Sequence, residues 1–480
     1  MQARTQVRGS AAVRWARPGH RPRASTVVLL GMVVSALLFV TSLTAYLIDA
    51  ISHLGVLTWY DLNVYNDAGL IARQLPSILY TWELTPSIKF TYTPFAALVF
   101  AAGSILSWDA LRWLMTIVSL ISIPATVWLT LTAMGRRGAG RAGVMLAVSA
   151  LAFWIEPVTK GLALGQVEPV LLLLVVWDLT RNDDRRWKGI GIGIAAGIKL
   201  VPLIFIPYLL FAGKIRQAIV STATFFATVV LGFILLPGPS SSYWLTGYFL
   251  RPGRTGGVDS LVNQSLLAVI ARQMGGAPQA QPVWLPVFAV VTLLGCVAGA
   301  ILARSGRPVQ GWVLVGVTSV LASPISWDHH WVWIVAVLAM LAGLAMTAGR
   351  SMRWVYILLL LLTATVYGAW PWRYSGTDAF VPSRGFLGWF VMPPRIYQVT
   401  SLHGWQLLTW NLFVAGGAVI FIAMTAVAAV IWRRHDQPRA LAAGPGPHGT
   451  IEALLARADA VLNGRSSPAA DEKAATDKNA

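Results

Sequence analysis

The uncharged run from Val27 to Ile48 constrains this chain more than any other feature of its sequence. The run is long enough to cross a bilayer as one helix, which takes about 20 apolar residues. Comparable apolar runs recur along the 480 residues, and only 12% of the chain is charged, whereas a soluble domain carries roughly 25% charged residues. The sequence therefore predicts an all-α polytopic membrane protein.

The residues before this first run are basic. Residues 1–25 contain six arginines and no acidic residue. A cleavable signal peptide has a shorter apolar core and a small-residue cleavage site, so we expect an uncleaved signal-anchor, with residues 1–25 as a cytoplasmic basic arm. The net charge of +18 then reflects Lys and Arg beside membrane spans and does not indicate nucleic-acid binding. The single cysteine, Cys296, allows no internal disulfide and no metal cluster.

Basic clusters also flank the later apolar runs, and cytoplasmic loops carry an excess of Lys and Arg. With short or re-entrant helices included, we expect about 10–12 transmembrane helices in a domain at 26–432, with 49–93 as its first outer loop. Residues 433–480 are expected to form a cytoplasmic tail that is largely disordered. Placing every basic cluster inside puts the crossings after the first at about 110–134, 141–155, 165–180, 216–236, 283–304, 310–324, 331–348, 353–370 and 409–432.

Two apolar segments do not fit a simple crossing. Pro94–Leu106 is too short, and we expect a short helix that dips from the outer face. Gly189–Ala212 has basic clusters at both ends and Pro202 inside it. Because proline breaks a helix, we expect two short helices that turn near Lys199. Irregular backbone at that depth is tolerated only where protein or a cavity surrounds it, which predicts a cavity below the outer loops.

The polar motifs all fall on the side that this topology makes non-cytoplasmic. The first is Trp59–Gly69, which holds two carboxylates, two amides and two tyrosines just after the first span. Asp61 is the candidate for chemistry. Asp67 would point elsewhere on a shared helix, which turns about 100° per residue, and both also fit an ordinary polar loop. The other motifs are Glu156–Glu168, the loops 237–282 and 371–408, and Ser323–His330.

Several residues of these motifs suit a site for a phosphorylated substrate. Lys199 at membrane depth, and the neighbouring His329 and His330 at the membrane edge, are costly to place there without a role. Adjacent histidines point apart on a helix, which favours phosphate contact over a metal chelate. Arg251 and Arg254 carry guanidinium groups that match phosphate. The alternatives are snorkelling for Lys199 and solvated loop charge for the arginines.

The connection Glu156–Glu168 is longer and more charged than a hairpin turn needs. We therefore expect Gln166 or Glu168 to line the site. No phosphate-binding loop, dinucleotide fingerprint, zinc motif or nucleophile elbow occurs in a supporting context.

Taken in order, these motifs resemble those of the actinobacterial polyprenol-phosphate-mannose-dependent α-(1→2)-mannosyltransferases of the GT-C membrane glycosyltransferase class. That group includes phosphatidylinositol-mannoside and lipoarabinomannan enzymes. The resemblance covers residues 27–432, with two departures: Thr93 stands where proline is usual, and Glu168 where asparagine is common. The motifs that carry it are Asp61–Tyr65, Phe90–Phe95, Gly165–Glu168, Gly197–Pro202, Asn263–Ser265 and Ser323–Trp331.

The resemblance implies a GT-C-type fold whose outer loops form the site, with Asp61 as the catalytic aspartate. Asp61 would act as general base on the acceptor hydroxyl while mannose leaves polyprenyl-phosphate-mannose with inversion. The protein would be a multi-pass protein of the inner (plasma) membrane with both termini cytoplasmic and the site periplasmic, without metal or other cofactor. Contacts to the donor phosphate are expected from His329, His330, Lys199, Arg251 and Arg254, and contacts to sugar or acceptor from Asn63, Tyr65, Tyr92, Gln166, Glu168, Asn263 and Gln264.

Two other functions stay open at this point. A lipid-linked-sugar flippase or transporter would have internal repeats and a charged path to both faces. An oligosaccharide ligase of similar topology would use a larger lipid-linked glycan as donor. The acceptor is equally open between a phosphatidylinositol mannoside, a lipomannan backbone and an arabinan cap.

Overall fold

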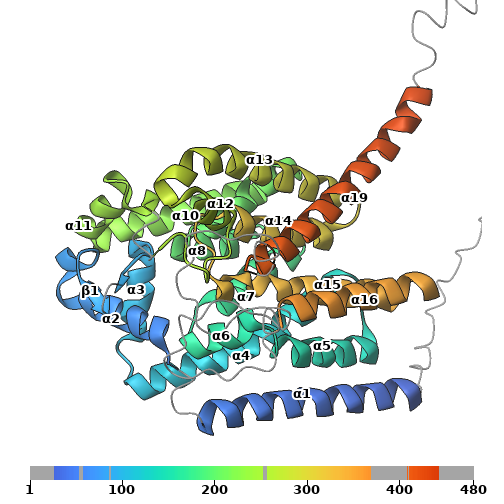
Figure 1. The fold of residues 1–480 in the computed structure, drawn as a ribbon, viewed down its shortest axis with the longest axis horizontal. Coiled ribbons are helices and arrows are strands. Elements are labelled where there is room, and N and C mark those ends of the chain that lie inside the picture. Colours follow the sequence, from blue (N-terminus) through green and yellow to red (C-terminus); the bar gives the residue numbers. More distant parts are fainter. Residues whose placement is uncertain are drawn as a thin grey trace, which may run out of the picture.

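The computed structural model describes residues 26–52, 58–85, 88–251, 257–368, 408 and 410–442. These residues form a helical assembly with one small two-stranded hairpin (Figure 1), so the all-α prediction is confirmed. The predicted basic arm at 1–25, nearly all of the predicted loop 371–408 and the tail beyond Ala442 lie outside the described residues.

Six helices of the described chain are long and apolar enough to cross a membrane, as a multi-pass protein requires. They coincide with crossings expected from the sequence. The last one runs to Ala442, beyond the predicted end at 432. The six are α1 (Thr26–Ser52), α4 (Trp108–Ala133), α10 (Ile215–Leu235), α13 (Ala277–Arg304), α15 (Ile334–Thr347, continuous with the 3-10 helix η6, Asp328–Trp333) and α19 (Leu412–Ala442).

Shorter helices fill the space between these spans. One pair is bent by 118° across a three-residue break and counts as a seventh span only if taken together. Its first member was expected to be part of a polar connection, but all of its residues are buried. The pair is α6 (Glu156–Leu164) and α7 (Glu168–Thr180), and the other short helices include α3 (Pro94–Gly103), α5 (Gly138–Ala152), α14 (Pro308–Ala322) and α16 (Arg350–Val366).

The segment with basic clusters at both ends is broken at Lys199, as the sequence predicts. Helix α8 (Ile190–Ile198) ends there, and Lys199 takes an extended conformation with φ −137°. A Cβ on Gly193 would lie 2.5 Å from the Thr224 Cβ, so glycine lets α8 approach α10 closely. The chain then continues as the 3-10 helix η2 (Val201–Ile204) and α9 (Phe205–Phe211).

The segment after α1, expected as an outer loop, contains helix α2 (Tyr60–Gln74). Leu62, Tyr65, Ala68 and Ala72 are buried and recur at helical spacing, so one face of α2 is available for packing. That face meets α3, where a Cβ on Gly69 would lie 2.5 Å from a backbone oxygen of α3. A 3-10 turn η1 (Pro76–Ile78) and the antiparallel strands β1 (Glu83–Thr85) and β2 (Ile88–Lys89) follow.

The centre and the edge of the assembly differ sharply in burial. The apolar window at Asp328–Thr347 is 72% buried, whereas that of α1 is 6% buried. Helix α1 lies along the outside and packs mainly against α5 (Figure 1). The loop between α10 and α13 holds the short helix α11 (Pro237–Ser240), a π-helical turn η3 (Ser241–Leu245), the 3-10 turn η4 (Tyr248–Leu250) and α12 (Leu266–Met274).

Candidate active site

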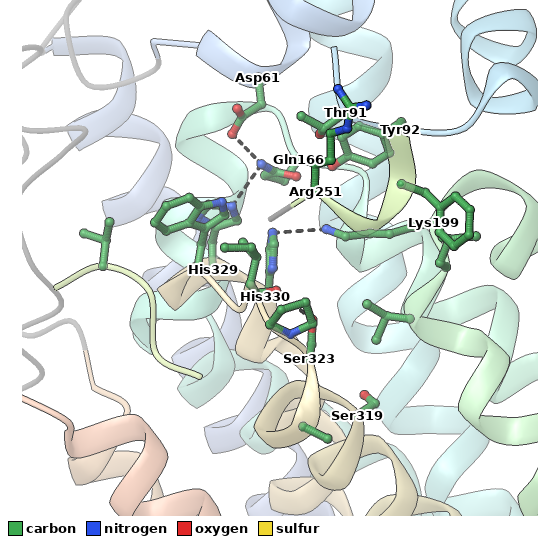
Figure 2. Close-up of a pocket in the computed structure, with 18 of the residues that line it drawn as sticks. Asp61, Thr91, Tyr92, Gln166, Lys199, Arg251, Ser319, Ser323, His329 and His330 are labelled. Atoms are coloured by element: carbon green, nitrogen blue, oxygen red, sulfur yellow. Dashed lines mark hydrogen bonds between the residues drawn. The ribbon is translucent and has the colours of Figure 1, made fainter. Parts of the chain in front are cut away.

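A cavity of about 1160 Å³ lies where α2, the bent pair α6–α7, the broken segment α8–η2 and η6 meet (Figure 2). A cavity was predicted from the broken helix at Gly189–Ala212. Its polar lining comes from side chains far apart in the sequence, and its other walls are mostly apolar. The polar lining includes Asp61, Tyr65, Lys89, Thr91, Tyr92, Lys160, Gln166, Lys199, Arg251, Asp328, His329 and His330.

Gln166 links the carboxylate of Asp61 to the ring of His329 (Figure 2). Its amide nitrogen donates to Asp61 Oδ2 and lies 3.0 Å from His329 Nε2. Its amide oxygen accepts the Tyr65 hydroxyl at 2.7 Å. An amide nitrogen can only donate, so His329 Nε2 is the acceptor and the ring proton sits on Nδ1.

A second carboxylate holds His329 from the other side. Asp328 Oδ1 accepts the His329 backbone N–H at 2.8 Å and lies 3.1 Å from His329 Nδ1. Asp328 Oδ2 pairs with the ammonium of Lys160. Both members of this ion pair are buried, and a buried charge needs a partner of opposite sign. The pair therefore fixes the His329 ring with Nε2 toward Gln166.

His330 meets a second ion pair. The Lys199 ammonium pairs with Glu168 Oε1 and lies 3.0 Å from His330 Nε2. Because ammonium can only donate, His330 Nε2 accepts. The same ammonium lies 5.4 Å from the Tyr92 ring centroid, within the range of a cation–π contact. In this arrangement the fixed positive charge belongs to Lys199, and both histidines present acceptor nitrogens.

Burial shapes the proton affinity of the groups around Asp61. Burial raises the pKa of the Asp61 carboxyl above its ordinary value, and the hydrogen bond from Gln166 opposes that rise. Burial also raises the pKa of Tyr65 and of Tyr92 well above the ordinary tyrosine value. Both phenols therefore stay protonated, while the carboxylate becomes a stronger base.

The turn between α6 and α7 places Gln166 beside Asp61. Gly165 has φ 69°, and a Cβ there would lie 2.7 Å from the Leu62 Cβ, so this close approach needs glycine. Trp59, next to α2, is the one non-glycine residue with positive φ in the described chain (41°). Its backbone N–H donates at 2.9 Å to a carbonyl of α6. These contacts hold the start of α2 against the end of α6.

The rest of the cavity is mostly apolar. Its walls come from the broken segment on one side and from α13 on the other. Leu285 and Phe288 of α13 are also exposed, so this compartment reaches the outside of the helical assembly. The apolar walls include Ile198, Leu200, Val201, Leu203, Ile204, Trp284, Leu285 and Phe288.

The structure brings most of the predicted site residues together but not all of them. Asn263 and Gln264 do not line the cavity, contrary to our expectation. Asn263 donates at 2.8 Å to the Val258 carbonyl and accepts the Ser326 N–H at 2.9 Å, and Gln264 donates at 2.9 Å to the Trp410 carbonyl. Their amides are bound to backbone and hold the loops in place. The predicted residues in the lining are Asp61, Tyr65, Tyr92, Gln166, Lys199, Arg251, His329 and His330.

The remaining predicted residues take other places. Asn63 and Glu168 are absent from the lining, although Glu168 contacts two residues that belong to it. Asp67 is half-buried and also absent from it. Arg254 lies outside the described residues.

Sequence reasoning missed the pair formed by Lys160 and Asp328. The two residues are 168 positions apart, and no spacing rule links them. A lysine within the largely apolar stretch Thr159–Leu164 is itself a signal, because a buried cation needs an anionic partner. The sequence does not say which carboxylate provides it.

Side chains that could bind a metal ion do not cluster in the described part of the chain. Among the described residues, no group of three or more His, Cys, Asp or Glu side chains could hold a metal ion. The absence of a metal from the reaction stays a prediction.

Comparison with known proteins adds an independent line of support. The sequence model of glycosyltransferase family 87 matches residues 90–324. A polyprenol-phosphate-mannose-dependent alpha-(1-2)-phosphatidylinositol pentamannoside mannosyltransferase of Mycobacterium tuberculosis is 29% identical, over 82% of this chain and 90% of its own length. A protein of the same name from Mycolicibacterium smegmatis is 28% identical, over 75% of this chain and 86% of its own length.

A third relative points the same way. A polyprenol-phosphate-mannose-dependent alpha-(1-2)-phosphatidylinositol mannoside mannosyltransferase of Mycobacterium tuberculosis is 27% identical, over 70% of this chain and 82% of its own length. No solved structure matches the chain. These matches confirm the resemblance drawn from the ordered motifs. With the all-α, multi-pass architecture, they identify the chain as a membrane glycosyltransferase of the GT-C type that is similar to family 87.

Proposed function

We propose that this chain is an α-(1→2)-mannosyltransferase that moves mannose from polyprenyl-phosphate-mannose to a mannosylated glycolipid. The donor, the linkage and a phosphatidylinositol-mannoside acceptor come from the names of its relatives. The observation that carries the proposal is one cavity that joins the Asp61 carboxylate, the Lys199 and Arg251 cations and an apolar compartment. A sugar carried on a lipid phosphate needs all three.

The donor would lie across the boundary between the two compartments. Its prenyl chain takes the apolar compartment between η2 and α13, which is open at Leu285 and Phe288. Burial of each CH₂ contributes about 0.8 kcal/mol, so even part of a prenyl chain is a strong anchor. The phosphate then falls near Lys199 and Arg251, and mannose faces Asp61 and Gln166.

The chemistry follows from this placement. The acceptor hydroxyl oxygen forms a bond to the mannose anomeric carbon as the bond from that carbon to the phosphate oxygen breaks. Asp61 takes the hydroxyl proton, and the bonding pair leaves with the phosphate. Attack from the face opposite the leaving group converts a β-linked donor into an α-linked product, which is inversion.

The surrounding residues would assist in separate ways. The leaving phosphate gains negative charge, and fixed cations aimed at that charge lower the barrier. Lys199 and Arg251, which both line the cavity, would supply these cations. His329 and His330 would contact the donor phosphate only after gaining a proton on Nε2, because both nitrogens accept hydrogen bonds from Gln166 and Lys199. Gln166 orients Asp61, and the protonated hydroxyls of Tyr65 and Tyr92, 2.8 Å apart, would bind sugar hydroxyls.

The proposal includes the orientation of the chain in the membrane. Both termini would be cytoplasmic and the cavity would open to the periplasmic face of the plasma membrane, because basic clusters flank the opposite ends of the spans. No metal or other cofactor takes part.

The test is transfer from labelled polyprenyl-phosphate-mannose by the purified full-length protein to a panel of acceptors, followed by linkage analysis. The panel holds a phosphatidylinositol mannoside, a lipomannan and an arabinan-capped acceptor. We expect one α-(1→2)-linked mannose to be added to the phosphatidylinositol mannoside. Transfer only from a lipid-linked oligosaccharide would instead indicate a ligase, and movement of intact donor across vesicles without transfer would indicate a flippase.

A further inference from the structure

Glu168 is the carboxylate that the proposed mechanism does not use. It is the first residue of α7 and is buried. One oxygen, Oε1, contacts both the Lys199 ammonium and His330 Nε2, the latter at 3.3 Å. The other, Oε2, is buried and has no hydrogen-bond partner in the described part of the chain. Glu168 therefore pairs with Lys199 through one oxygen and keeps a second oxygen without a hydrogen-bond partner among the described residues.

The backbone just before Lys199 is held by Thr93. Lys199 follows the last turn of α8, and the Thr93 hydroxyl donates to the Gly197 carbonyl at that end. Thr93 also accepts the Ala96 N–H at 3.1 Å as the cap of α3. The two residues at which this chain departs from the related motifs, Thr93 and Glu168, thus both act on the position of Lys199.

The charges around the phosphate position are nearly balanced as a result. Lys160 is already neutralised by Asp328, and Lys199 is neutralised by Glu168. A phosphodiester carries one negative charge, and the phosphate released by transfer carries up to two. A cation shared with a fixed carboxylate holds such a dianion less tightly than a free cation does.

We propose that Glu168 is a counter-anion that weakens the hold of Lys199 on the released polyprenyl phosphate and so speeds product release. This inference rests on the proposed function. When the phosphate reaches Lys199, Glu168 competes for the same ammonium, and that competition grows as the phosphate gains its second charge. Glu168 acts through Lys199 and is a positioning residue, not a group that touches the reacting atoms.

The test compares full-length wild type with Glu168→Gln in lipid nanodiscs, using polyprenyl phosphate as the ligand. We expect the variant to bind polyprenyl phosphate about tenfold more tightly, because one competing charge is gone. The donor KM should fall, and kcat should fall with it as release slows. Binding of the uncharged polyprenol should not change.

Two further variants make the result decisive. Asp109→Asn removes an exposed carboxylate that also pairs with a cation, Arg112, and should leave every constant unchanged. Glu168→Asn is a second neutral variant for use if Glu168→Gln does not fold. Weaker or unchanged binding of polyprenyl phosphate by a folded neutral variant overturns this inference alone, whereas a wild type that neither binds the lipid phosphate nor transfers mannose overturns the proposed function.

Discussion

Two ion pairs of similar composition stand on two sides of the cavity, and they differ in what surrounds them. Each joins a lysine, a carboxylate and one of the adjacent histidines. Lys160 and Asp328 are buried, and both Asp328 oxygens have partners. Lys199 is less buried, with 18% of its side chain exposed, and the Glu168 Oε2 has no partner in the described chain.

The difference separates two tasks. A buried and fully satisfied pair cannot exchange partners without a large cost, so Lys160–Asp328 fixes the geometry around His329 and Gln166. A pair whose lysine is partly exposed and whose carboxylate has an unpartnered oxygen can exchange partners, so Lys199–Glu168 suits a site that must bind and release a phosphate. The rigid pair thus contacts His329, and the exchangeable pair contacts its neighbour His330.

The largest expected effect comes from breaking the buried pair. Asp328→Asn leaves the Lys160 ammonium without its counter-charge and should cost about 3–5 kcal/mol of stability. Thermal unfolding in detergent should show a large drop in midpoint, and transfer should be lost with it. The matched change in the other pair, Glu168→Gln, should lower the midpoint much less because its lysine is partly exposed. Equal losses in the two variants would contradict the distinction between the pairs.

The next effect tests the link between the two halves of the site. Gln166→Ala removes the donor shared by Asp61 and His329. Transfer should fall about 100-fold, since misplacement of a reacting group by about 1 Å costs that much. The unfolding midpoint should change little. Retained activity would show that Asp61 is positioned without the Gln166 amide. The control is Asn263→Ala, which removes an amide outside the cavity. This control should lower stability and leave kcat unchanged.

Removing the exchangeable cation should have a smaller effect. Lys199→Met keeps an apolar stem in place and should raise the donor KM about tenfold, as expected for one charge-assisted contact to phosphate. The protein should stay folded because the Lys199 side chain is partly exposed, at 18%. Lys160→Met, by contrast, should unfold the protein. A Lys199→Met variant with unchanged donor KM would remove Lys199 from the phosphate site.

The smallest effect is on pH dependence. Asp61 must be ionised to accept a proton, so transfer falls as pH drops through its pKa. Because burial raises that pKa, the acid limb of kcat/KM should lie at higher pH than for an exposed aspartate. Gln166 opposes the rise by bonding the ionised form, so Gln166→Ala should move the limb further up. If Gln166→Ala leaves the acid limb unchanged, the limb does not report the titration of Asp61.

The membrane spans and the broken segment could be predicted because hydropathy and basic flanks report directly on them. Helix α2 could not, because its polar face hides the apolar spacing of Leu62, Tyr65 and Ala68. Helix α6 could not be predicted for a similar reason. Its charged residues Glu156 and Lys160 suggest a loop, although both are buried.

The candidate site divides along a similar line. Asp61, Gln166, Lys199, His329 and His330 stand in polar motifs, and the structure gathers them. The direction of an amide in an irregular loop has no sequence period, so Asn263 and Gln264 could not be separated from Gln166. Partners that meet only through the tertiary fold, such as Lys160 with Asp328, carry no local signal.

The central claim is that Asp61 is the base for transfer. Its most direct test is transfer from polyprenyl-phosphate-mannose by Asp61→Asn, with binding of polyprenyl phosphate and the unfolding midpoint measured on the same sample. We predict that lipid-phosphate binding and stability remain near wild type while transfer falls by about 10²–10⁴-fold, the usual contribution of general base catalysis. Near-normal transfer by the folded variant would contradict the assignment of Asp61.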